Sequence, residues 1–145
     1  MKILFTILLL SSSILSAEEV KLPAFEKSLG SELFFNKGEI SVGHTYGFAT
    51  DKKLDALKPM LLKFLGKGWR MEIAPEEALK NMPSEDGMQF VGLARLLHKD
   101  MTEHEVGITL VKMPPASDKA LKKYSYMLSI TTANKAKIEK QKSTK

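Results

Sequence analysis

The chain has 145 residues, of which 43% are hydrophobic and 27% are charged, and it contains no cysteine. This composition is typical of a globular protein and excludes a fibrous or mainly disordered chain. The absence of cysteine excludes a disulfide framework, thiol catalysis and cysteine-ligated zinc. The length is that of a single domain.

The net charge of +5 is concentrated near the C-terminus. Of the 22 Lys and Arg residues, Lys2 and five in residues 134–145 lie outside region 18–133, which leaves 16 there. The same region holds 16 of the 17 Asp and Glu residues, because only Glu139 lies outside it. This balance argues against nucleic-acid binding, which requires an excess of basic residues on a folded surface. We expect residues 134–145 to form a lysine-rich flexible tail that aids solubility, with weak contact to anionic surfaces as an alternative role.

The first 17 residues have the order of features typical of a secretory signal peptide. Met1 and Lys2 provide a positive start, residues 3–10 are mainly apolar, and residues 11–17 are mainly small. The apolar run is shorter than the ~20 residues that a membrane-spanning helix needs. We therefore expect a signal peptide at 1–17 and a soluble, periplasmic or secreted bacterial domain at 18–133.

Two helices and one strand are predicted in the first half of the mature chain. Pro23 and a fourfold apolar spacing predict a short helix over 21–36, followed by a turn at Lys37 and Gly38. Strict alternation over 40–49 predicts a strand. Helical spacing then predicts the main helix after Thr50, which is a candidate cap, with Gly66 and Gly68 ending it. Pro59 should kink this helix or divide it. The apolar positions of the main helix are Leu54, Leu57, Leu61, Leu62 and Leu65.

The second half of the chain reads mainly as strands. Alternation predicts strands at 69–73, 105–113 and 123–132, with a short helical turn from Pro75 to Lys80 and a loop at 82–87. Residues 88–99 fit either a helix or a strand, and we favour the strand because the next segment can pair with it. Together these elements predict an α+β domain. It has a single, mostly antiparallel sheet of about five strands, with the main helix and the short N-terminal helix on one face.

Potential metal ligands are concentrated in the segment from His98 to Glu105. His98, Met101 and His104 recur at intervals of three, either on one side of a helix or around a hairpin turn. Imidazole with thioether suits copper, and imidazole with carboxylate suits zinc. The alternative is a polar hairpin tip that binds no metal, which the same residues explain.

Three further residues are candidates for a binding site. His44 and Tyr46 lie on the apolar face of the predicted strand 40–49, and His44 is either a neutral core histidine, a residue at the sheet margin or the base of a pocket. Trp69 follows a helix stop and lies beside Arg70, so it either closes the core or stacks on a ligand.

No sequence motif identifies an enzyme, because the chain has no nucleophile elbow, phosphate-binding glycine loop or paired histidines around a glutamate. We therefore predict an exported, non-enzymatic binding domain, such as an inhibitor-like module, that recognises a protein or other component of the bacterial envelope. The alternative is a periplasmic metal-binding protein that uses His98, Met101 and His104. A hydrolase with His44 as its base is a third possibility.

Overall fold

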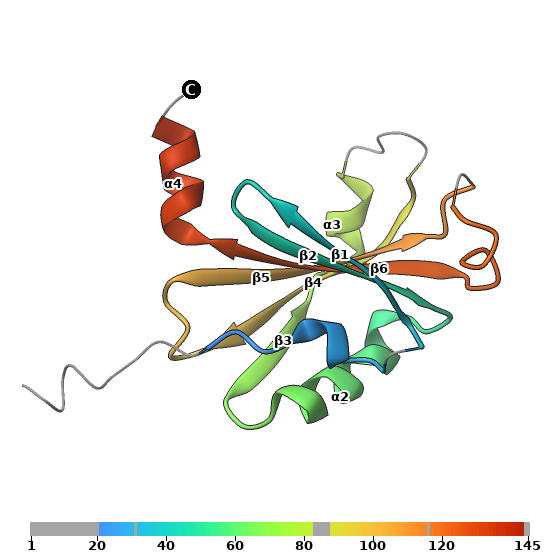
Figure 1. The fold of residues 1–145 in the computed structure, drawn as a ribbon, viewed down its shortest axis with the longest axis horizontal. Helices are drawn as coiled ribbons and strands as arrows, with labels where there is room; N and C mark the ends of the chain where they lie inside the picture. Colours follow the sequence, from blue (N-terminus) through green and yellow to red (C-terminus); the bar gives the residue numbers. More distant parts are fainter. Residues whose placement is uncertain (1–20, 31, 83–87, 116, 144–145) are drawn as a thin grey trace, which may run out of the picture.

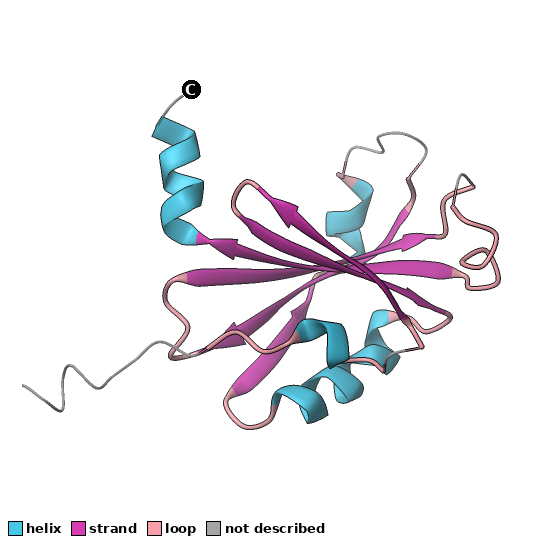
Figure 2. Cartoon of the chain, viewed as in Figure 1, coloured by secondary structure: helices cyan, strands magenta, loops and turns pink. Residues whose placement is uncertain are grey.

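The computed structural model describes residues 21–30, 32–82, 88–115 and 117–143. These residues form one antiparallel sheet of six strands in the order β1-β2-β6-β5-β4-β3 (Figures 1 and 2). The strands are β1 (Phe34–Ile40), β2 (Gly43–Thr50), β3 (Trp69–Ile73), β4 (Phe90–His98), β5 (His104–Lys112) and β6 (Tyr126–Asn134). The helical elements are the 3-10 turn η1 (Phe25–Lys27) and helices α2 (Leu54–Leu65), α3 (Glu76–Lys80) and α4 (Lys135–Ser143). The mixed α+β class with one antiparallel sheet is confirmed, but the sheet has six strands rather than about five.

The order of the strands places the last strand, β6, inside the sheet and leaves β1 and β3 as the edges. Strand β6 lies between β2 and β5, so the last strand joins the first hairpin to the later strands. Helix α2 connects β2 to β3, and three other strands lie between these two in the sheet (Figure 1). No helix in the described part of the chain is both long and apolar enough to cross a membrane.

The core follows the period-two pattern of the strands. Alternate residues of β4, β5 and β6 are buried, whereas β2 is buried continuously from Tyr46 to Thr50. Helix α2 and η1 add side chains to the same cluster. A methyl group at Gly92 of β4 would lie only 2.6 Å from Cδ1 of Leu54, so the helix approaches the sheet closely at this point. The core residues with no exposed surface are Phe25, Phe48, Leu57, Leu61, Ile108, Leu110, Leu128 and Ile130.

The sixth strand is the main correction to the predicted fold. The short helix expected over 21–36 is wrong, because only Phe25–Lys27 form a helical turn and Phe34–Ile40 form β1. The turn expected at Lys37 and Gly38 is also wrong, because these residues pair with β2 and the chain turns at residues 41–42. Aromatic pairing across the strands outweighs the helical spacing, since the rings of Phe34 and Phe48 lie 5.5 Å apart.

The main helix is present but differs from the prediction at its start and centre. It runs through Pro59 as one element. An interior proline removes one backbone hydrogen bond from a helix, but the burial of Leu54, Leu57 and Leu61 offsets this loss. Thr50 does not cap it: the N-cap is Lys53, and Thr50 Oγ1 accepts a hydrogen bond from the Lys52 amide at 3.0 Å. The predicted end is confirmed, since Gly66 has a φ of 85° and its amide bonds to Leu62.

The predicted elements of the second half are confirmed. Strands β3 and β5 and the helical turn α3 lie within one residue of their predicted bounds, and residues 90–98 form a strand as favoured. Strand β6 is present, but it begins at Tyr126, three residues later than predicted. Most of the loop expected at 82–87 lies outside the described residues.

The lysine-rich C-terminal residues form helix α4, where we expected a flexible tail. Asn134 Oδ1 accepts a hydrogen bond from the Lys137 amide at 3.1 Å, which is an N-cap interaction. Lys142 lies 3.6 Å from Glu139 one turn earlier, and Gln141 donates to Ser41 Oγ at 2.6 Å. No residue of α4 is buried, so the contacts of this helix lie at the surface.

Candidate functional site

Strand β3 is an edge strand with a regular register. It pairs with β4 only, through five consecutive residue pairs from Trp69–His98 to Ile73–Ala94. The Ala74 amide donates to the Leu93 carbonyl at 2.8 Å. Because hydrogen-bonded and non-hydrogen-bonded pairs alternate in antiparallel strands, the backbone groups of Arg70 and Glu72 also face β4. Those of Trp69, Met71 and Ile73 therefore face the open edge of the sheet.

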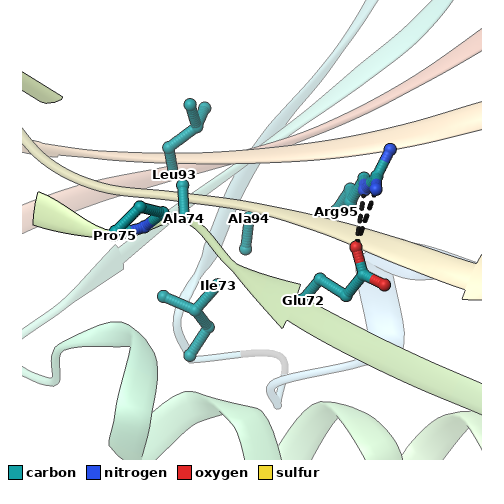
Figure 3. Close-up of a pocket in the computed structure, with 7 residues that line it drawn as sticks. All are labelled: Glu72, Ile73, Ala74, Pro75, Leu93, Ala94 and Arg95. Atoms are coloured by element: carbon teal, nitrogen blue, oxygen red, sulfur yellow. Dashed lines mark hydrogen bonds and ion pairs between the residues drawn. The ribbon is translucent and has the colours of Figure 1, made fainter. Parts of the chain in front are cut away.

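An apolar cavity of about 470 Å³ lies where β3 ends. Figure 3 shows Ala74 and Pro75 at one end of its lining, and the Glu72–Arg95 pair at the other. The volume lies within the range of sites that bind a ligand or a partner's side chain. Its lining comes from β3, β4 and the link between β3 and α3, and consists of Glu72, Ile73, Ala74, Pro75, Leu93, Ala94 and Arg95. We call this cavity the β3 groove.

Charged side chains surround the polar end of the β3 groove. Arg95 lies 2.8 Å from Oε2 of Glu72, and Arg70 lies 3.7 Å from Oε1 of the same carboxylate. The side chains of Arg70, Glu72 and Arg95 are 71%, 45% and 66% exposed, so these pairs contribute little to stability. Two guanidinium groups share one carboxylate, which leaves one positive charge at this end.

The three predicted metal ligands line a second cavity of about 290 Å³. The structure therefore brings His98, Met101 and His104 together at the turn between β4 and β5. His98 has other contacts, because its Nδ1 accepts a hydrogen bond from the Asp100 amide at 3.1 Å and its ring meets Trp69 edge-on at 5.3 Å. Lys135 also lines this cavity and adds a positive charge. No group of three or more His, Asp or Glu side chains in the described ranges is arranged to hold a metal ion.

The predicted binding residues His44, Tyr46 and Trp69 do not form one site. His44 is exposed near the start of β2 and lies opposite Glu39 and Thr132, so it is not buried in the core, and it lines neither of the two cavities described above. Tyr46 is buried against Phe25, with ring centroids 5.7 Å apart. Trp69 lies on β3, and three strands separate it from β2.

Sequence patterns did not point to the β3 groove, because most of its lining is alanine, leucine, isoleucine and proline. These residue types carry no catalytic or ligand signature, and only the pairing of β3 with β4 brings them together. The alternation of Arg70 and Glu72 with apolar residues indicated a strand, but not that it lies at the edge of the sheet.

Comparison with known proteins gives no match among family models, curated proteins or solved structures.

Proposed function

We propose that this chain is an exported, non-enzymatic binding domain that holds an apolar side chain of a partner protein in the β3 groove. The observation that carries the proposal is an apolar cavity of about 470 Å³ open beside an edge strand. Burial of an apolar group in such a site is favourable by about 25 cal/mol for each Å² removed from water.

The charged end of the groove favours a partner with an acidic group next to its apolar one. Arg70 and Arg95 are mostly exposed and share Glu72, so a carboxylate of the partner can bind a guanidinium nitrogen without displacing a buried charge. The apolar end would then provide affinity, and the charged end would fix the orientation of the partner segment.

The test is to fill the groove and measure recovery of the partner. Ala74→Phe adds a ring to the lining, and Ala136→Phe is a matched control because Ala136 is exposed on α4. We expect the natural chain and Ala136→Phe to retain the same protein from an envelope extract, and Ala74→Phe to lose it. Equal retention by all three chains would overturn the proposal, provided that circular dichroism shows the same fold for each.

Metal binding at the turn between β4 and β5 is a second candidate, supported by the shared cavity of His98, Met101 and His104. Copper(I) is the better candidate, because a thioether with imidazoles is a soft ligand set. Native mass spectrometry with copper or zinc supplied tests it. A copper site is supported if the natural chain and Met127→Leu retain copper and Met101→Leu does not. No retained metal would remove this candidate.

A further inference from the structure

We propose that two copies of this chain associate by antiparallel pairing of their β3 strands, with the two-fold axis at Met71. The paired edges would join two six-stranded sheets into one. The proposal rests on the edge strand itself and is independent of what binds in the β3 groove.

The backbone of β3 allows this pairing in a register centred on Met71. The outward-facing backbone groups belong to Trp69, Met71 and Ile73, as the Ala74–Leu93 hydrogen bond requires. In an antiparallel pair, hydrogen-bonded residues lie directly opposite each other. Met71 would therefore face Met71 of the second copy, and Trp69 would face Ile73. Every outward residue of β3 gains a partner in this register.

The charges of β3 select the same register. With Met71 on the axis, Arg70 lies opposite Glu72 of the second copy, and Glu72 lies opposite Arg70. These are non-hydrogen-bonded pairs, in which the side chains approach most closely. If one strand slides by one pairing step along the other, Arg70 lies opposite Arg70 of the second copy. If it slides in the other direction, Glu72 lies opposite Glu72 of the second copy. Both alternatives set like charges against each other, so one register is favoured over its neighbours.

Strand β3 and its neighbouring helix α2 each carry a partly exposed apolar side chain. Phe64, on the last turn of α2, is 38% exposed and is one of two large hydrophobic side chains exposed in the described part of the chain. Helix α2 contacts β3, so Phe64 belongs to a helix that neighbours this edge strand. Trp69 is half-buried and has surface left for a partner.

The opposite edge of the sheet is less suited to pairing. The other exposed large hydrophobic residue, Ile40, lies there in β1. However, the register of β1 shifts between Phe34 and Asn36, which marks a bulge or irregularity. Bulges are one of the features that protect edge strands from pairing with another chain. Gly38 also occupies the centre of the regular part of β1, where it offers no side chain to a partner. Strand β3 has neither feature.

The dimer would also place a second copy beside each β3 groove. Ile73 lines the groove, and Trp69 of the second copy would lie opposite Ile73. Each groove would then be bordered by a tryptophan from the other chain. If the groove binds a partner as proposed above, dimerisation and partner binding should strengthen each other.

The first experiment uses two charge reversals that complement each other. Arg70→Glu leaves acidic residues at positions 70 and 72 of the chain, and Glu72→Arg leaves basic residues at the same two positions. Each variant alone should self-associate at least about tenfold more weakly than the natural chain in sedimentation equilibrium, because two attractive pairs become repulsive. Mixed together, they should form a heterodimer, since both cross-strand pairs are then complementary. Lys112→Glu is the control, because Lys112 is exposed on β5, away from this edge.

The second experiment locates the interface by amide hydrogen exchange at low and high protein concentration. The Met71 and Ile73 amides should become protected as the dimer forms, while those of Arg70 and Glu72, which already bond to β4, should change little. A chain that is monomeric at all concentrations would overturn the proposal. So would self-association with protection of the Lys37 and Glu39 amides of β1, or failure of the two variants to form a heterodimer while both keep the natural fold.

Discussion

Arg95 approaches a single carboxylate oxygen of Glu72 with two nitrogens, Nε at 2.9 Å and Nη2 at 2.8 Å. This contact joins β3 to β4 on the surface and forms the polar end of the β3 groove. Both side chains are more than 40% exposed, so solvent screens their attraction. Their contribution to stability is therefore small, and the role that we propose for them is in recognition of a partner.

Replacement of Arg95 by Gln should separate these two roles. We expect the free energy of unfolding to fall by no more than about 1 kcal/mol, because an exposed ion pair contributes little. Partner binding in the β3 groove should weaken more than this. Urea denaturation measures the first effect, and titration with the isolated partner measures the second.

Gly92 and Gly107 form a matched pair for the core between α2 and the sheet. A methyl group at Gly92 would lie 2.6 Å from Leu54 Cδ1 and 3.3 Å from Leu110 Cβ, whereas one at Gly107 would meet nothing within 4 Å. Gly92→Ala should therefore destabilise the protein by about 1–3 kcal/mol, because Leu54 is buried and must move. Gly107→Ala should be neutral or stabilising by up to about 1 kcal/mol. Equal effects in urea denaturation would show that Leu54 does not pack against Gly92 in solution.

Leu57 tests the contribution of α2 to the core. Its side chain has no exposed surface, so Leu57→Ala should lower the free energy of unfolding by about 2–5 kcal/mol. Phe64→Ala, on the same helix, removes a side chain that is 38% exposed and should cost much less. Thermal unfolding of the two variants should rank them in this order, and the reverse order would contradict the observed orientation of the helix.

The cap of α4 provides a local test. Asn134→Ala removes the side chain that accepts the Lys137 amide, and such a loss costs about 0.5–2 kcal/mol of helix stability. Because α4 buries no residue, we expect its amides to exchange faster while the midpoint of global unfolding hardly changes. A large drop in the unfolding midpoint would mean that α4 supports the sheet.

Strand alternation was the most reliable guide to this fold. Apolar residues at every second position around Met71, Ile108 and Leu128 predicted one strand each, because one face of each strand is buried. The fourfold spacing of Phe25, Leu29 and Leu33 misled the prediction of an N-terminal helix. Phe25 and Leu29 are buried in the core, but the following residues gain more from pairing as β1.

The candidate sites show the corresponding limit of sequence patterns. The cluster of His98, Met101 and His104 was visible because ligand residues lie close together in sequence, and the fold keeps them around one cavity. The β3 groove was not visible, because its lining depends on the register that brings Ile73 opposite Ala94. The register between strands depends on the pairing of the whole sheet, so the residue types of one segment do not predict which residues will lie opposite it.

Photocrosslinking from the β3 groove tests the proposed binding function most directly. A photoreactive residue at position 74 should form an adduct with a different protein in the intact cell envelope, while the same residue at position 136 of α4 should not. Adducts at both positions, or at neither, would contradict the assignment of the β3 groove as the binding site.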